Sequence, residues 1–76
     1  MERAYVMINC EMGSEGNVIE QLKPVTCVKD IRGVYGNYDI LVELEGQSID
    51  EISHTISSKI RKLEKVRSTT TIVCVN

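Results

Sequence analysis

The sequence contains no tryptophan and no phenylalanine, so its three tyrosines supply all of the aromatic surface. The other large apolar side chains are isoleucine, valine, leucine and methionine. A chain of 76 residues buries only about 60% of the surface that its unfolded form exposes. We therefore expect a single domain, residues 1–76, with a thin core, in which an apolar sheet face left open to water would be a costly loss.

Paired cysteine motifs are missing as well. Cys10, Cys27 and Cys74 lie far apart, and the sequence has neither a C-x-x-C pair nor a cysteine–histidine cluster. It therefore predicts no metal site, no cofactor and no disulfide framework, and we expect three buried, reduced thiols that act as small apolar residues. The single histidine, His54, falls on the outer side of a predicted helix, where solvation is a simpler explanation than a ligand or acid–base role.

Long apolar runs and an excess of one charge are also absent. Residues 1–4 lack the apolar core of a signal peptide, and no run approaches the roughly 20 apolar residues of a membrane span, so we expect a cytoplasmic protein without membrane contact. The net charge is −2, which gives no electrostatic footprint for direct DNA binding. Lys59, Arg61, Lys62 and Lys65 gather at the end of a predicted helix, and a solvated face that complements the helix dipole explains them.

Apolar patterns predict four strands. The first spans residues 4–10 and is apolar on both faces over most of its length, so both faces must be covered. The second spans residues 25–34, with a bulge expected at Arg32-Gly33. The third, residues 38–45, should be central and nearly fully buried, and the fourth spans residues 66–75.

Two helices are predicted between these strands. Ser14 is a suitable N-cap for a helix over residues 15–23, which Pro24 ends because it has no amide to donate. The second helix begins after Ser48, with Glu51 at the capping-box spacing. It carries an apolar stripe over about four turns, formed by Ile49, Ile52, Ile56, Ile60 and Leu63.

This order of elements predicts an α+β, ferredoxin-like βαββαβ fold, an antiparallel four-stranded sheet with both helices on one face. Right-handed crossovers are expected to place the first and third strands centrally and parallel to each other, with the second and fourth at the edges. The other sheet face would then be open, with Tyr5, Met7, Val28 and Leu41 on it. Because large exposed apolar patches mark interfaces, we predict a homodimer of the dimeric α/β barrel type, its two sheets packed back to back through these residues.

A turn at Gly36-Asn37 precedes the third strand, since glycine takes positive φ at little cost. Tyr35 and Tyr38 flank this turn and Asp39 follows it. In one interpretation the tyrosines pack as cross-strand neighbours and Asp39 accepts a hydrogen bond from a backbone amide. In the other they line a binding site, where Asp39 meets an ammonium group and the turn amides meet a carboxylate.

Three threonines in the fourth strand also have two explanations. They are ordinary strand formers, and the pattern needs nothing more. Alternatively, Thr69 and Thr71, which share one face of the strand, offer hydroxyls to a small polar site.

Three segments resemble the effector-binding domain of the Lrp/AsnC family, also called the regulation-of-amino-acid-metabolism domain. These are the opening Ala4-Tyr5-Val6, the turn Gly36-Asn37-Tyr38-Asp39, and residues 66–73, which are similar to a Val-x-x-Thr-x-Thr-x-x-Val ending. The resemblance spans nearly the whole chain. It implies the fold above, dimers that assemble further, often as four dimers in a ring, and a free amino acid or related small metabolite bound between neighbouring dimers.

The resemblance also brings the turn and the last strand to one shared site across subunits. The ligand-binding residues it implies are Tyr35, Gly36, Asn37, Tyr38, Asp39, Thr69 and Thr71. Two departures matter. Full-length members carry an N-terminal helix-turn-helix, and nothing precedes Arg3 here, so we expect no operator binding through that module. Tyr35 stands where the family usually has a small hydroxyl residue, and a phenol there would narrow the pocket.

Three hypotheses for the function follow. The first is a stand-alone amino-acid-sensing module, not an enzyme, that associates with itself or with full-length Lrp/AsnC-type regulators. The second is a purely structural oligomerisation partner without a ligand. The third, a small dimeric α+β barrel enzyme, is the weakest, because the sequence offers neither a nucleophile–base pair nor a phosphate-binding glycine loop.

Overall fold

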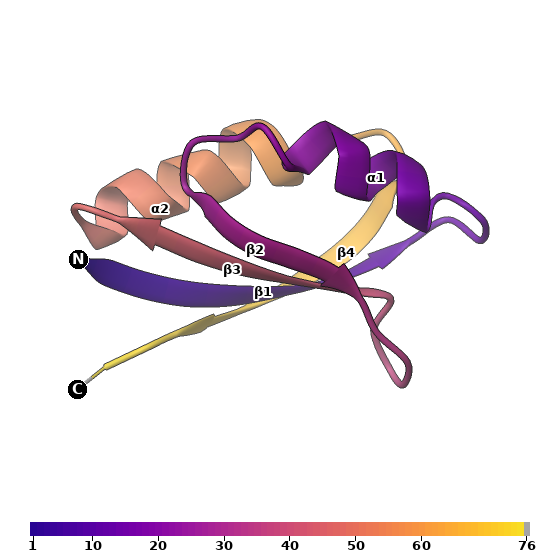
Figure 1. Ribbon diagram of the computed structural model, residues 1–76, viewed down its shortest axis with the longest axis horizontal. Helices are drawn as coiled ribbons and strands as arrows, with labels where there is room; N and C mark the ends of the chain where they lie inside the picture. The colour runs from indigo at the N-terminus through magenta and orange to yellow at the C-terminus, as the bar shows by residue number, and fades with distance from the viewer. Residues whose placement is uncertain (76) are drawn as a thin grey trace.

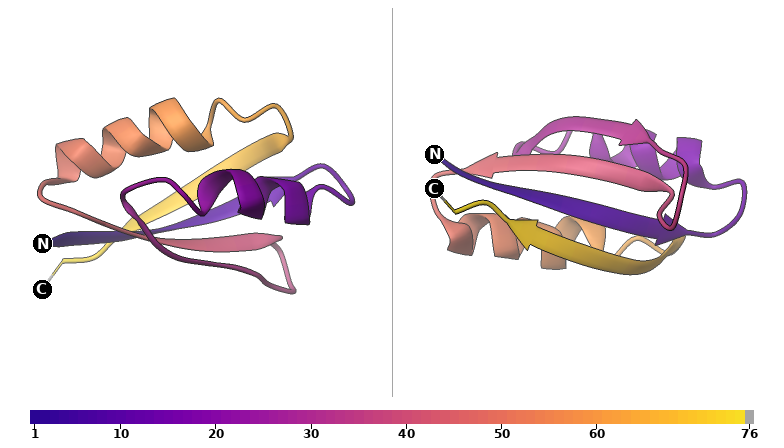
Figure 2. Two further views of the ribbon diagram at one scale, coloured as in Figure 1. Left: turned by 45° about the horizontal axis from the view of Figure 1, so that its top comes forward. Right: turned by 90° about the horizontal axis from the view of Figure 1, so that it is seen from below.

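The computed structural model describes residues 1–75. Its elements in chain order are β1 (Glu2–Cys10), α1 (Glu15–Leu22), β2 (Val28–Gly33), β3 (Ile40–Gly46), α2 (Ile49–Thr55), a π-helical turn η1 (Ile56–Ile60) and β4 (Val66–Val73). Both helices lie on one face of the sheet, and the other face is open (Figures 1 and 2). The predicted ferredoxin-like βαββαβ fold is confirmed.

The sheet has the strand order β2-β3-β1-β4, which confirms β1 and β3 as the central strands. Every neighbouring pair is antiparallel, so the expectation that β1 and β3 run parallel is wrong. Each helix connects two strands that are not neighbours, β1 to β2 and β3 to β4. These crossover pairs run in the same direction, and the strand between them runs in the opposite one.

The core lies between the sheet and the helices. From Ala4 onward in β1, and throughout β3, residues alternate between buried and half-buried positions, as the period of a strand requires. The fully buried large side chains are Val6, Ile8, Val18, Leu22, Ile40, Val42, Leu44, Ile52 and Ile60. Each contributes about 1.5–3 kcal/mol relative to an exposed position, so this one layer holds the small fold together.

The second helix begins with the predicted cap. The Ser48 hydroxyl accepts a hydrogen bond from the Glu51 amide at 3.1 Å, and the Glu51 carboxylate accepts one from the Gln47 amide at 2.6 Å. The helix ends in the π-helical turn, where the Arg61 amide donates to the Ile56 carbonyl at 2.9 Å. The apolar stripe predicted an uninterrupted α-helix, and the wider turn was not predicted. No helix within residues 1–75 is long and apolar enough to cross a membrane.

The edge strand β2 differs most from its prediction. It begins at Val28 rather than Val25, and its pairing with β3 is irregular between Val28 and Asp30, whereas Arg32 and Gly33 pair regularly. Because of this shift, Val28 pairs with Leu44 and packs against the core. The expectation that Val28 lies on the open sheet face is therefore wrong.

The cysteines are free thiols, as predicted. Cys10 and Cys27 are buried, but Cys74 is only half-buried, so the expectation of three buried thiols is wrong for Cys74. This residue follows the last residue of β4, and its amide still donates to the Arg3 carbonyl of β1 at 2.9 Å.

Candidate functional site

The turn between β2 and β3 is a six-residue loop closed by a hydrogen bond from the Val34 amide to the Asp39 carbonyl, at 3.0 Å. Gly36 has a φ of +121°, a conformation that other residues rarely adopt. Tyr35 at the tip is fully exposed. The loop extends away from the helices at one end of the sheet (Figure 1).

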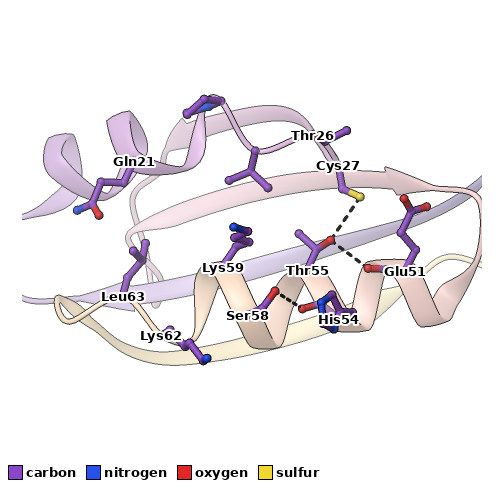
Figure 3. A pocket seen from close by; sticks show the side chains of 12 residues that line it. Gln21, Thr26, Cys27, Glu51, His54, Thr55, Ser58, Lys59, Lys62 and Leu63 are labelled. Carbon is purple, nitrogen blue, oxygen red and sulfur yellow. Dashed lines mark hydrogen bonds between the residues drawn. The ribbon is translucent and has the colours of Figure 1, made fainter.

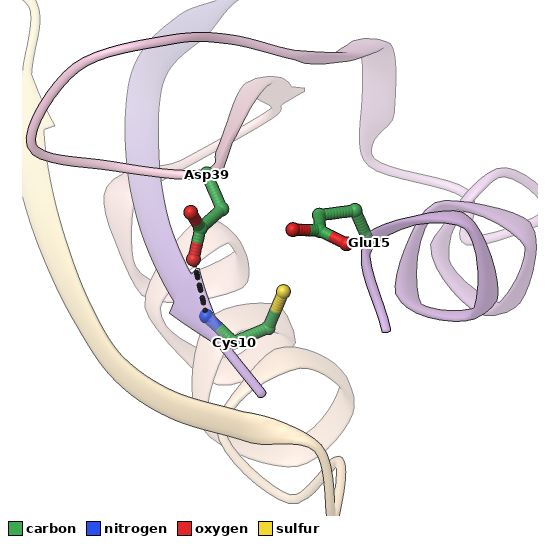
Figure 4. A group of neighbouring side chains, drawn as sticks. All are labelled: Cys10, Glu15 and Asp39. Carbon is green, nitrogen blue, oxygen red and sulfur yellow. Dashed lines mark hydrogen bonds between the residues drawn. The ribbon is translucent and has the colours of Figure 1, made fainter. Parts of the chain in front are cut away.

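Asp39 joins this loop to β1 through two hydrogen bonds. Its carboxylate accepts one from the Cys10 amide at 2.9 Å (Figure 4), and its own amide donates to the Ile8 carbonyl at 2.9 Å. The interpretation of Asp39 as an acceptor for a backbone amide is confirmed, whereas the same interpretation is wrong for Tyr35, which is fully exposed and does not pack against a cross-strand neighbour. The same bond fixes the orientation of the carboxylate, so it does not exclude a role in binding.

Three side chains converge beside this bond. A carboxylate oxygen of Glu15, a carboxylate oxygen of Asp39 and the Cys10 sulfur all lie within 4.8 Å of one another (Figure 4). These donor types occur in cation sites, but burial, reinforced by the charge of Asp39, raises the pKa of the Cys10 thiol. A protonated thiol is a poor metal ligand, so the group does not by itself make a metal site.

Two hollows meet at these carboxylates. The first, of about 480 Å³, is lined by Glu15, Gly33, Val34, Tyr35, Gly36, Tyr38 and Asp39. The second, of about 490 Å³, is lined by Cys10, Met12, Glu15, Asp39 and Arg67. The structure thus brings together four of the predicted site residues, and the fifth turn residue, Asn37, is exposed outside these hollows.

The predicted threonines lie elsewhere in the same chain. Thr69 pairs with Ile8 along one edge of β1, whereas Asp39 bonds to Ile8 along the other edge. Thr69 lines a different hollow, of about 380 Å³, with Arg61 and Arg67. Thr71 pairs with Val6 and is exposed. Strand β1 therefore separates Thr69 and Thr71 from the turn, and a site containing both segments stays a prediction for an assembly of chains.

One hydrogen bond does connect the turn with the threonine strand. The Tyr38 hydroxyl donates to the Thr70 hydroxyl oxygen at 3.3 Å. Since β1 lies between β3 and β4, the Tyr38 side chain must reach across β1 on the open side of the sheet, where Thr70 pairs with Met7. The contact uses Thr70, the threonine that was not predicted to take part.

The open sheet face carries Tyr5, Met7 and Leu41, all half-buried, as predicted. A charged group borders them. Arg3 lies 3.2 Å from Glu43 and 2.8 Å from Glu45, and its hydrogen bond lowers the pKa of the Glu45 carboxyl. The face is therefore apolar in its centre and charged at one end.

A further hollow, of about 660 Å³ and so larger than the three above, is a groove between the helices that contains none of the predicted site residues (Figure 3). His54 lines it and is exposed, as predicted. The hydroxyl of Thr55 donates to the Glu51 carbonyl at 3.0 Å, and that of Ser58 to the His54 carbonyl at 2.7 Å. Because these hydroxyls are bonded to the helix backbone, they are not arranged as nucleophiles.

Sequence reasoning missed Cys10, Glu15 and Arg67 as neighbours of Asp39. Each has an ordinary local explanation. Cys10 ends a strand, Glu15 is an acid in the first turn of a helix, and Arg67 is a charged residue beside a run of threonines. The pairing register of the strands places Cys10 and Arg67, and the connection from β1 to α1 places Glu15, so neither spacing nor composition could have signalled them.

Comparisons with known proteins give a consistent result. Residues 3–76 match the family model described as the Lrp/AsnC ligand binding domain. The crystal structure of FFRP-DM1 is similar with a TM-score of 0.94 and 31% identity, over 99% of this chain and 100% of that chain. The hypothetical protein PHS023 from Pyrococcus horikoshii is similar with a TM-score of 0.93 and 30% identity, over 100% of this chain and 92% of that chain.

A more distant structure shares the fold. The transcriptional regulator NMB0573 from Neisseria meningitidis, solved as a complex with L-Met, has a TM-score of 0.88 and 10% identity. The match covers 99% of this chain but 50% of that chain, so the sequence corresponds to about half of that regulator. No curated protein sequence matches significantly.

Proposed function

Because this chain belongs to the Lrp/AsnC ligand-binding domain family, we propose that it is a non-enzymatic domain that binds a free amino acid or related small metabolite. It acts by assembling with itself or with transcription regulators of the same family. The observation that carries the proposal is the polar hollow at Tyr35, Gly36, Tyr38 and Asp39. The complex of the regulator NMB0573 with L-Met supports an amino acid as the ligand class.

The turn offers both kinds of group that a zwitterion needs. Asp39 is oriented by the Cys10 amide, and its carboxylate accepts the ammonium group of the ligand. The amides of Gly36 and Asn37 donate to the ligand carboxylate. Burying either ligand charge without such partners would be costly, which is why both kinds are required.

The rest of the site comes from a neighbouring subunit. Within one chain β1 lies between Asp39 and Thr69, so the hydroxyls of Thr69 and Thr71 reach the ligand only from another copy. Tyr35 is fully exposed in the single chain. In the assembly its ring covers the ligand and narrows the site.

The homodimer forms through the open sheet face, with Tyr5, Met7 and Leu41 at its centre. Strand β4 supports this assembly, because Ile72 and Val73 point to opposite faces and are 52% and 42% exposed. In a barrel-type dimer, the packing of the two sheets against each other removes the Ile72 side chain from solvent. Pairing of the β4 edge with the sheet of the partner subunit removes the Val73 side chain from solvent. Dimers then associate further, as tetramers of dimers.

Calorimetry tests this proposal. At least one free amino acid should bind the parent protein, and Asp39→Ala should weaken that binding by about 1.5–3 kcal/mol, the range for a hydrogen bond to a charged group. Equal binding by parent and variant would place the site elsewhere.

A second function has an observation in its favour. The Asp39 carboxylate accepts a hydrogen bond from the Cys10 amide. This structural role explains an aspartate at position 39 without any ligand. If no amino acid binds but the assembly persists, the chain is a structural oligomerisation partner.

A further inference from the structure

The two hollows beside the turn share a wall that carries two negative charges, Glu15 and Asp39. Arg67 lines the second hollow with them. Within residues 1–75, none of these three groups lies within ion-pair distance of an opposite charge. Some exposed charges elsewhere pair, as Glu20 does with Lys23 at 3.2 Å, and others, such as Lys59 and Lys62, do not within residues 1–75.

Charges of opposite sign that face one hollow without touching suit a zwitterion between them. A guanidinium binds a carboxylate with charge-assisted hydrogen bonds, so Arg67 adds a positively charged partner for the ligand α-carboxylate to the amides of Gly36 and Asn37. Asp39 suits the α-ammonium group. Glu15 then remains without a partner if the side chain of the ligand is neutral.

The charge balance of the hollow leads to the same conclusion. Glu15 and Asp39 contribute two negative charges and Arg67 one positive charge. Burial and the nearby Asp39 raise the pKa of the Cys10 thiol, so the thiol stays neutral and adds none. A ligand with one net positive charge neutralises the site, whereas a neutral amino acid leaves a negative charge uncompensated.

We infer that this site selects an amino acid with a cationic side chain, a diamino or guanidino acid, whose side-chain cation pairs with Glu15. The inference rests on the proposed function and names the ligand class of that same site. Met12 and Tyr35, both fully exposed, line the two hollows on either side of the carboxylates. They provide apolar surface for the methylene chain that links the two charged ends of such a ligand.

Glu15 also has a simpler explanation, because an acid in the first turn complements the dipole of its helix. That explanation predicts no ligand preference. The two therefore differ in a measurable result.

The test is calorimetry with L-lysine and L-norleucine, which differ by the side-chain ammonium group. The parent protein should bind L-lysine at least tenfold more tightly than L-norleucine. Glu15→Gln should abolish this preference by weakening only the binding of L-lysine, and Arg67→Gln should weaken both ligands by a similar factor. Glu20→Gln, an exposed acid on the same helix, is the matched control and should change neither affinity.

Three outcomes would overturn the inference while leaving the proposed function in place. These are equal binding of both ligands by the parent, tighter binding of L-norleucine, and a preference for L-lysine that survives in Glu15→Gln. Thermal unfolding of each variant separates a lost contact from a lost fold. If no amino acid binds the parent, the proposed function fails together with the inference.

Discussion

Asp39 links the loop to the central strand, and its replacement by alanine should destabilise the protein even without a ligand. The change removes the acceptor of the Cys10 amide, and Cys10 is only 6% exposed, so the amide loses its partner at a largely buried position. A buried donor without a partner costs about 1–3 kcal/mol. In a domain of this size each 1 kcal/mol lowers the melting temperature by about 4–8 °C, so we expect a decrease of about 5–20 °C.

Asp39→Asn is the matched control, because the amide oxygen still accepts from Cys10 while the negative charge is lost. It should lower the free energy of unfolding by less than about 1 kcal/mol, since neutral hydrogen bonds are weaker than charged ones. Urea denaturation at one fixed protein concentration measures both variants, because the stability of an oligomer depends on concentration. If Asp39→Ala unfolds within about 0.5 kcal/mol of the parent, the usual range for surface changes, the hydrogen bond to Cys10 does not stabilise the loop.

Met7→Lys should dissociate the dimer, because it places a charge in a desolvated contact; light scattering that shows an unchanged dimer would place the interface elsewhere. His54→Ala should change the free energy of unfolding and ligand affinity by less than about 0.5 kcal/mol, and a larger loss by calorimetry or denaturation would assign the helix groove a role. Thr71→Val should weaken ligand binding by about 1 kcal/mol, the contribution of one neutral hydroxyl, and unchanged calorimetry would remove Thr71 from the site. The pKa of the Cys10 thiol is raised in the folded state, so the thiol contributes fully to the free energy of unfolding below about pH 8.5, the ordinary thiol pKa. This contribution should be lost as the pH rises through the raised pKa. Urea denaturation of Cys10→Ala should show a smaller loss of stability at alkaline pH.

The central strands and the apolar stripe of the second helix could be predicted because their burial follows a simple period. Val6, Ile8 and Val42 alternate with half-buried neighbours, and a thin core leaves few alternatives for them. The side of the sheet on which Val28 lies could not be predicted, because one irregular pairing with β3 shifts the alternation of an edge strand. The mistaken direction of the central pair came from the connections, since a crossover sets the relative direction of the strands it joins and not of their neighbours.

The candidate site was predicted in part for a related reason. Tyr35, Gly36, Tyr38 and Asp39 are close in sequence, so one turn brings them together. Glu15 and Arg67 belong to other elements. The place of Arg67 beside Asp39 depends on the register of β1 against both of its neighbours, and that of Glu15 depends also on the connection from β1 to α1. Local patterns carry no information about such contacts.

Native mass spectrometry of the protein with a panel of free amino acids tests the central claim most directly, because one spectrum reports the assembly and its bound ligands together. We predict an assembly with an even number of chains that retains at least one of the amino acids, and loss of that adduct in Asp39→Ala while the dimer remains. A monomer that retains none of the amino acids would contradict the account.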